Sequence, residues 1–292
     1  MIDYLQLLVL GAVAGLTIFL GLPLALLQGV SSRKKGFLNA LSIGILIFLI
    51  IDVFSQAWEK TEDIAVSAFS GAAPVVDAVM DLVAIIGGLA LGLLGLVFYE
   101  SRYMPRQQAP KMQDSPIIES GSRAASGVSA QMQQSRLVRQ VDPYRFAMMI
   151  ATGIGVHNFS EGLAIGQSYV AGSTGLALLL IIGFGAHNAT EGFGIAGPLT
   201  GLSNRPSARF LAIAGLIGGG PTFLGTIVGS LWTSVFVYVL FLSIAGGALV
   251  YVSMLMYNAG RAQTTNGILM IGLFFGLCAG FLTDLVVVLG GA

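Results

Sequence analysis

Long apolar runs alternate with short polar breaks along almost the whole chain. A helix that crosses a lipid bilayer needs roughly 20 apolar residues. The chain contains repeated runs near that length, and this pattern predicts an all-α polytopic membrane protein with eight membrane-spanning helices. The expected spans are residues 4–28, 36–57, 76–99, 144–167, 173–197, 208–230, 235–257 and 265–288.

One long polar segment interrupts the pattern. Residues 100–143 are rich in Gln, Ser, Pro and Arg and have no periodic apolar face. A segment of this composition buries too little apolar surface to fold by itself. The sequence therefore predicts three spans in residues 1–99, a disordered cytoplasmic loop over 100–143, two spans in 144–197 and three spans in 198–292.

The basic residues predict the orientation, because short loops rich in Lys and Arg stay in the cytoplasm. With eight spans and both termini outside, every one of the 14 basic residues except Lys60 falls on the cytoplasmic side. Moving or removing one span would scatter these charges over both sides. The residues expected in the cytoplasm are Arg33, Lys34, Lys35, Arg102, Arg106, Lys111, Arg123, Arg136, Arg139, Arg145, Arg205, Arg209 and Arg261.

The composition agrees with a membrane location. Only 10% of the residues are charged, and the mean hydropathy is +0.85, whereas about 25% of residues are charged in soluble domains. We therefore expect a multi-pass protein of the cell (inner or plasma) membrane, with the lipid bilayer as partner. The formal net charge is zero, and we expect no nucleic-acid partner. The single Cys278 can form no disulfide within the chain.

A six-residue pattern occurs twice near the middle of the chain. It reads His-Asn-Phe-Ser-Glu-Gly at 157–162 and His-Asn-Ala-Thr-Glu-Gly at 187–192. Residues four apart on a helix share one face, so each His lies over its Glu, and each Asn lies three residues before that Glu. These are also the only two histidines in the protein. The candidate metal ligands are His157, Asn158, Glu161, His187, Asn188 and Glu191.

Both copies fall at the centre of adjacent, antiparallel expected spans and should meet near the bilayer midplane. A charged side chain there costs about 2.5–3.5 kcal/mol on insertion scales, which a bound cation would offset. Two imidazoles, two carboxylates and amide oxygens suit zinc, iron, manganese, cobalt or cadmium better than calcium or Cu(I). The alternative is a polar cluster that joins the two helices without a metal ion.

Acidic residues gather toward the expected outer side. They form either a mouth that concentrates cations or, for Asp77 and Asp81, a favourable first part of the third helix. Asp52, in the outer part of the second span, is a possible entrance residue or an interfacial aspartate in contact with water. Asp284 lies near the outer end of the last span. The cluster around the outer loop between the second and third expected spans comprises Glu59, Glu62, Asp63, Asp77 and Asp81.

The paired His-Asn-x-x-Glu-Gly motifs, on consecutive spans after a long cytoplasmic loop, resemble those of the ZIP (Zrt/Irt-like) metal transporters. Residues 14–16 and 21–23 are similar to the first helix of that family, and residues 247–252 to its seventh. The resemblance implies uptake of zinc or a related divalent ion into the cytoplasm, a 3+2+3 inverted repeat and a homodimer. It also implies an elevator-like movement of spans one, four, five and six against the others.

By motif position, the resemblance assigns the two His and two Glu to a primary metal site and the two Asn to a second one. The chain departs from the family pattern in three places. Ser160 and Thr190 stand where most members have proline, the sixth span reads Gly-Gly-Gly-Pro-Thr at 218–222 without a carboxylate, and the seventh ends Met-Leu-Met-Tyr at 254–257 without glutamate.

Three functions remain open at this point. The favoured one is a transporter and not an enzyme. The second is a membrane sensor that binds metal without moving it, because the acids of the sixth and seventh spans are missing. The third is a metal-dependent intramembrane hydrolase, in which the ion activates water, although the chain lacks a His-Glu-x-x-His pattern.

Overall fold

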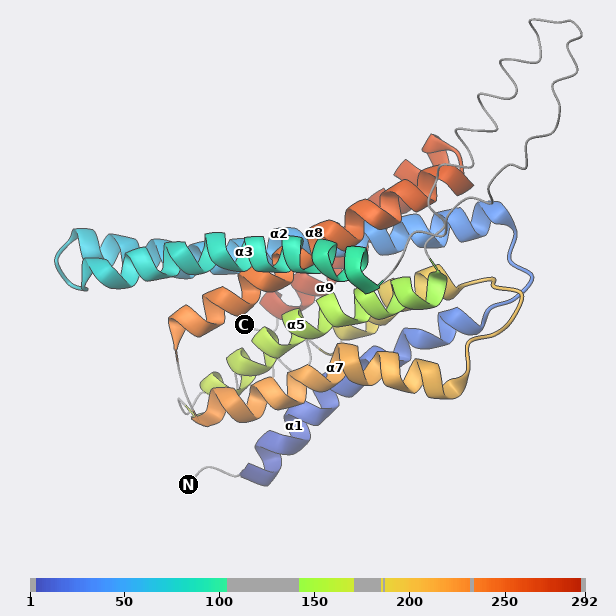
Figure 1. Ribbon diagram of the computed structural model, residues 1–292. Coiled ribbons are helices and arrows are strands. Elements are labelled where there is room, and N and C mark those ends of the chain that lie inside the picture. The colour runs from blue at the N-terminus through green and yellow to red at the C-terminus, as the bar shows by residue number, and fades with distance from the viewer. Residues whose placement is uncertain (1–3, 104–141, 171–184, 186, 232–233, 290–292) are drawn as a thin grey trace, which may run out of the picture.

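The computed structural model describes residues 4–103, 142–170, 185, 187–231 and 234–289, and every secondary-structure element in these ranges is a helix (Figure 1). The long helices lie roughly along one another, as expected for a bundle. In chain order the elements are α1 (Tyr4–Leu16), η1 (Thr17–Leu20), η2 (Leu22–Leu26), α2 (Ser32–Phe69), α3 (Val75–Tyr103), α5 (Pro143–Val170), a helical stretch at 187–196, η3 (Gly197–Leu199), α7 (Ala208–Leu231), α8 (Val235–Gln263) and α9 (Asn266–Leu289).

Six helical stretches among the described residues are long and apolar enough to cross a membrane, and they correspond to the first three and last three expected spans. α5 is long enough but carries polar residues in its central turns and is not one of the six. Of the fifth expected span, residues 173–184 and 186 lie outside the described residues. An all-helical membrane protein is confirmed, and the total of eight spans stays a prediction. The six stretches are Tyr4–Leu26, Ser32–Phe69, Val75–Arg102, Ala208–Leu231, Val235–Asn258 and Asn266–Leu285.

The first expected span, residues 4–28, is not one continuous α-helix. α1 ends at Leu16, and two short 3₁₀ helices, η1 and η2, continue the path to Leu26. Pro23 lies at the start of η2 and has no N–H to extend the α-helical ladder. Gly21 separates η1 from η2, and a Cβ atom there would lie 2.3 Å from the carbonyl oxygen of Ala189. The break lets the chain pass close to the stretch 187–196.

The helix that contains the second expected span extends beyond that span at its C-terminal end. α2 continues to Phe69 because residues 58–69 contain no Gly or Pro, and the chain turns only at Gly71, whose φ is +78°. Glu59, Glu62 and Asp63 were expected in a loop, and they lie instead on exposed positions of this helix.

The polar segment also begins later than predicted. α3 extends to Tyr103, so residues 100–103 belong to a helix rather than to the loop. The rest of the predicted loop, residues 104–141, lies outside the described residues. α5 begins at Pro143, a favoured first helical residue, and the backbone N–H of Tyr144 donates to the carboxylate of Asp142 at 3.0 Å.

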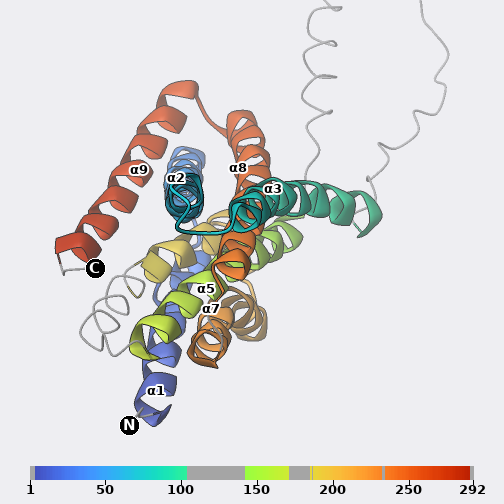
Figure 2. The same ribbon diagram turned by 90° about the vertical axis from the view of Figure 1, so that its left-hand side faces the viewer.

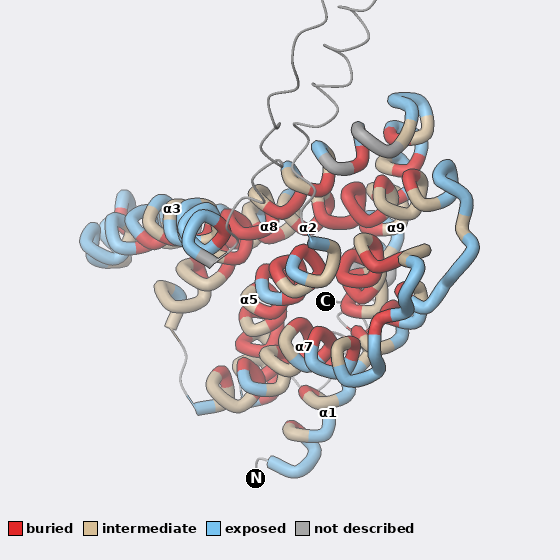
Figure 3. The backbone as a smooth tube through the Cα atoms, turned by 45° about the vertical axis from the view of Figure 1, so that its right-hand side comes forward, coloured by how far each residue is buried: buried red, intermediate tan, exposed pale blue. Residues whose placement is uncertain are grey.

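The helices pack as two units that lie on opposite sides of the view in Figure 2. The first helical unit comprises α1, α5, the stretch 187–196 and α7, in which α7 packs against both α5 and α1. The second helical unit comprises α2, α3, α8 and α9, in which α8 packs on α3 and α2, and α9 packs on α2. The main contact between the units joins α5 to α8, and buried residues concentrate around it (Figure 3).

Glycines let helices approach within each unit. In the first unit, a Cβ atom on Gly219 would lie 2.1 Å from the carbonyl oxygen of Gly15. In the second unit, a Cβ atom on Gly92 would lie 2.0 Å from the carbonyl oxygen of Ile244. Between the units, a Cβ atom on Gly153 of α5 would meet only side chains, first the Cβ atom of Ala248 at 3.6 Å.

Candidate metal centre

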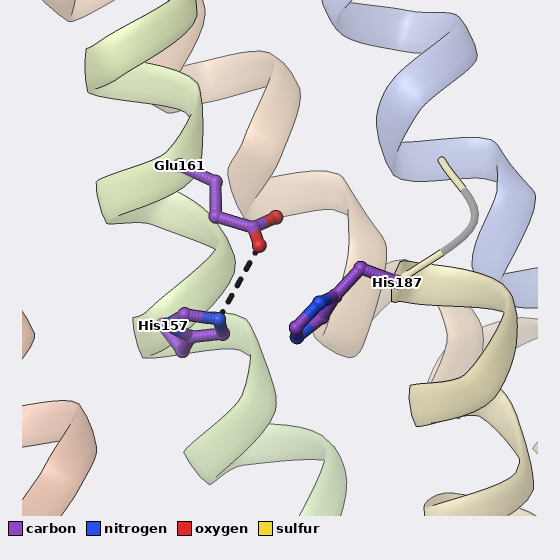
Figure 4. Close-up of side chains that lie close together, drawn as sticks. All are labelled: His157, Glu161 and His187. Carbon is purple, nitrogen blue, oxygen red and sulfur yellow. Dashed lines mark ion pairs between the residues drawn. The ribbon is translucent and has the colours of Figure 1, made fainter. Parts of the chain in front are cut away.

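Three side chains from two helical stretches converge in the interior of the protein (Figure 4). His157 and Glu161 lie one turn apart on α5, and their Nε2 and Oε1 atoms are 3.3 Å apart. His187 points toward them from the start of the stretch 187–196, with 5.9 Å between the centroids of the two imidazole rings. One potential ligand atom from each of the three residues lies within 4.8 Å of the other two.

Glu191 lies beside the same cluster. Its Oε1 atom is 3.8 Å from Nε2 of His157 and 3.9 Å from Nε2 of His187. The second carboxylate is therefore placed between the two imidazoles. The structure thus brings together both His and both Glu side chains that the repeated pattern singled out.

These four side chains are almost completely shielded from solvent, with exposed fractions between 0% and 6%. Several of their polar atoms form no hydrogen bond with any described residue. A buried polar group without a partner costs free energy, and a cation bound among these atoms would remove that cost. The atoms are Nδ1 and Nε2 of His157, Nε2 of His187, Oε2 of Glu161 and Oε1 of Glu191.

Asn158 orients one carboxylate of the cluster and attaches it to a neighbouring helix. Its side-chain amide N–H₂ donates to Oε2 of Glu191 at 2.9 Å and to the carbonyl oxygen of Gly218, on α7, at 3.0 Å. Four residues further along α5, a Cβ atom on Gly162 would lie 2.1 Å from the carbonyl oxygen of Thr222. The first motif is therefore fixed to α7 by its Asn and its Gly.

The second motif is fixed to α1 and η1 in the same way. The amide of Asn188 donates to the carbonyl oxygen of Ala14 at 2.8 Å. A Cβ atom on Gly192 would lie 2.2 Å from the carbonyl oxygen of Ile18, four residues after Ala14. Sequence reasoning treated both Asn as ligands and missed this anchoring role, although the repetition of Asn and Gly at fixed positions carried the signal.

The residues that replace the family's prolines behave differently from each other. Thr190 donates a hydrogen bond from its hydroxyl to the carbonyl oxygen of His187 at 2.7 Å, in the preceding turn. Ser160 is fully buried, and its hydroxyl has no partner among the described residues.

Asp52 lies on α2, outside the cluster of ligand atoms. The Asp52 carboxylate accepts a hydrogen bond from Gln56 at 2.8 Å, and Gln56 in turn accepts one from the hydroxyl of Tyr238 at 2.9 Å. These hydrogen-bonded side chains join α2 to α8.

The remaining acids are not part of the cluster. Asp77 lies in the first turn of α3, where a negative charge is favourable, and Asp81 is buried one turn later. Asp284 is half-buried on α9.

A bundle of apolar helices with buried imidazoles and carboxylates that converge offers ligand atoms for a divalent metal ion. The family model of the ZIP zinc transporters matches residues 104–287, more than half of the chain, and the protein belongs to this family. Among curated proteins, no sequence matches the chain. Membership and the apolar helices together define a multi-pass integral membrane protein that transports divalent metal ions.

Proposed function

We propose that the protein carries divalent metal ions, zinc foremost, into the cytoplasm through a site formed by His157, Glu161, His187 and Glu191. The observation that supports this most is the buried cluster itself, in which several nitrogen and oxygen atoms converge and have no hydrogen-bond partner among the described residues. In a family of metal transporters, such a cluster near the middle of the bilayer is the natural place for the transported ion.

The donor set favours a borderline cation. Imidazole nitrogens and carboxylate oxygens suit zinc, iron, manganese, cobalt and cadmium, and the cluster contains no thiolate. Asn158 and Asn188 keep their Oδ1 atoms without partners among the described residues. We propose that these oxygens serve a second and weaker position, because residues 218–222 of α7 provide no carboxylate.

The movement that we propose is a displacement of the first helical unit against the second, with the metal ion carried by the first. The glycine contacts that bring backbones together lie within the units, whereas α5 meets α8 through side chains. Side-chain surfaces can slide past one another more readily than interlocked backbones. The two motifs also attach to α7 and α1 by matching contacts, which supports an inverted repeat as the basis of the movement.

We propose that metal ions approach the centre past Asp52 from the side that we assign to the cell exterior. A cavity of about 250 Å³ opens between α2, α5 and α8 and includes Lys60, Gln167 and Tyr238 in its wall. The hydrogen bonds through Gln56 link Tyr238 to Asp52, so the tyrosine connects the cavity wall to the entrance carboxylate. In this orientation both termini lie outside the cell. We also propose that the protein forms a homodimer, as the resemblance to the family implies.

Uptake into proteoliposomes tests the proposal directly. We expect zinc uptake by the wild type and at least tenfold less by the Glu161→Ala and Glu191→Ala variants, each of which removes a carboxylate from the centre. Thr152→Ala, at an exposed position of α5, is the matched control and should transport normally. Unchanged uptake by both glutamate variants would refute the assignment of the site.

The same preparation separates the alternative functions. Zinc binding without uptake by the wild type would identify a sensor. Hydrolysis of a lipid or peptide, without ion movement, would identify a hydrolase. A double-mutant cycle on zinc affinity with His157→Ala and His187→Ala tests shared coordination, and we expect the two losses to be non-additive because both imidazoles bind one ion.

A further inference from the structure

A second cavity lies away from the candidate metal centre, at the start of α2. A cavity of about 680 Å³ opens there between the link that joins η2 to α2 and the start of α9. Leu27, Phe37 and Ile268 contribute apolar surface to its wall, and Arg33 and Lys34 contribute two cations. The site is therefore amphipathic, with basic groups beside an apolar surface.

The two cations differ from the third basic residue of the same run. Arg33 and Lys34 are exposed, and neither side chain has a hydrogen bond or ion pair with a described residue. The ammonium group of Lys35, in contrast, donates a hydrogen bond to the carbonyl oxygen of Gly201 and so has a partner within the protein. The positive charge at the cavity is therefore free to bind an anion.

The apolar wall continues away from the basic groups along the outside of the bundle. The ring of Phe37 contacts the ring of Phe275, on α9, edge to face with 6.2 Å between centroids. Phe275 is 51% exposed, as are its α9 neighbours Ile271 and Phe274 to a similar extent. In a membrane protein such exposed apolar side chains meet acyl chains.

We propose that this cavity binds an anionic glycerophospholipid. Arg33 and Lys34 hold the phosphate and headgroup, and the acyl chains run along Phe37 and Phe275. Charge complementarity selects an anionic lipid, and the continuous apolar wall distinguishes a lipid from a free phosphate ion, which would gain nothing from it.

The position of the cavity connects it to the rest of the molecule. The link that contributes Leu27 runs from the first helical unit to the second (Figure 1). The carbonyl oxygen of Leu27 accepts a hydrogen bond from the backbone N–H of Gly201, which follows η3, at 2.9 Å. A lipid held here therefore touches the joint between the units, and its effect on uptake, unlike its binding, depends on the proposed transport function.

Native mass spectrometry of the purified protein with phosphatidylglycerol or phosphatidylcholine tests the binding without any measurement of transport. For the double variant Arg33→Gln, Lys34→Gln, we expect phosphatidylglycerol affinity to fall about 30-fold, as two lost lipid contacts of roughly 1 kcal/mol each imply. Phosphatidylcholine, in which the choline cation offsets the charge of the phosphate, should lose much less affinity than phosphatidylglycerol does. The control, Arg205→Gln with Arg209→Gln, removes two exposed cations outside the cavity and should bind both lipids as the wild type does.

Two further measurements keep the result interpretable. A zinc-induced rise in melting temperature that equals the wild-type rise shows that the double variant is folded with an intact metal centre. Glycerol 3-phosphate added at millimolar concentration should leave phosphatidylglycerol bound, and displacement would show that the site takes a free phosphate compound, which overturns the proposal. Equal phosphatidylglycerol losses in the double variant and the control would overturn it as well.

Discussion

The two helical units differ in what their buried polar side chains contact. In the second unit, three buried hydroxyls bond back to their own helix: Ser42 to Leu38 at 3.1 Å, Thr61 to Ala57 at 2.9 Å and Ser243 to Val239 at 2.8 Å, and Ser42 is also 3.1 Å from the carbonyl oxygen of Phe193. In the first unit, Thr226 bonds back to its own helix in the same way, but the Asn158 and Asn188 side chains donate to other helices. Both units contain buried polar atoms without a described partner, and in the first unit such atoms from imidazoles and carboxylates converge, as expected for a ligand site.

The helix contacts within the units also differ from the contacts between the units. Within each unit, glycines bring backbones so close that no side chain fits, whereas α5 and α8 meet across the boundary through side chains. Each unit is therefore firmly packed, side chains form the boundary between α5 and α8, and the candidate metal centre lies in the first unit near that boundary. At this boundary, Phe48 of α2 lies next to His187 of the candidate metal centre, with 6.0 Å between the two ring centroids.

The largest expected effect comes from fixing the two units to each other. The Cβ positions of residues 153 and 248 are 3.6 Å apart, a separation at which a disulfide can form. In a Cys278→Ala background, Gly153→Cys with Ala248→Cys should lose nearly all zinc uptake when oxidised, because the cross-link blocks the proposed displacement of one unit against the other. Uptake should return with a reducing agent, and zinc binding should persist in both states. Full zinc uptake by the cross-linked protein would show that transport does not need one unit to move against the other.

A smaller effect is expected from the packing within the first unit. Gly219 and Gly220 are neighbours on α7, but a Cβ atom on Gly219 would lie 2.1 Å from a backbone oxygen, and one on Gly220 would have no neighbour within 4 Å. Gly219→Ala should therefore destabilise the protein by about 1–3 kcal/mol. Gly220→Ala should be neutral or stabilising by about 0.5–1 kcal/mol, because alanine favours a helix over glycine. Thermal or denaturant unfolding in detergent measures both, and equal destabilisation would contradict the packing.

The two Asn anchors should differ from each other. Asn158→Ala removes two hydrogen bonds and leaves Oε2 of Glu191 without its donor, whereas Asn188→Ala removes one described hydrogen bond, to Ala14. Loss of a partner for a buried group costs about 1–3 kcal/mol, so the first variant should be the less stable. It should also lose zinc affinity, because Glu191 is no longer oriented. Calorimetry of zinc binding checks this, and a greater loss of affinity in Asn188→Ala would show that the anchors are wrongly ranked.

The smallest expected effect is a difference in unfolding free energy between two serine variants, one in each unit. Ser243→Ala removes a hydrogen bond to the preceding turn and should cost about 0.5–1 kcal/mol. Ser160→Ala removes a buried hydroxyl that has no described partner and should leave the metal-free protein as stable or more stable. The unfolding free energies of the two variants, measured without metal, test this order. A larger loss in Ser160→Ala would reveal a partner for its hydroxyl.

Much of the candidate site could be predicted from the sequence because its spacing is local. Residues four apart share a helix face whatever surrounds them, so His157 and Glu161 had to lie together once that segment was helical. The acceptors of the two Asn amides could not be predicted, because the carbonyl oxygens of Gly218 and Ala14 belong to the backbone and carry no sequence signal. The C-terminal extension of α2 was also missed, because an apolar-run criterion ends where charged residues begin.

The sequence by itself determined the class of protein, the helical nature of the chain and the identity of the four His and Glu side chains, since apolar runs and helical spacing act over short stretches. Only the tertiary structure decided that His187 faces His157, that the helices divide into two units, and that Arg33 and Lys34 stand beside an apolar wall. These features depend on which distant segments pack together, and that choice is made by contacts spread over the whole bundle.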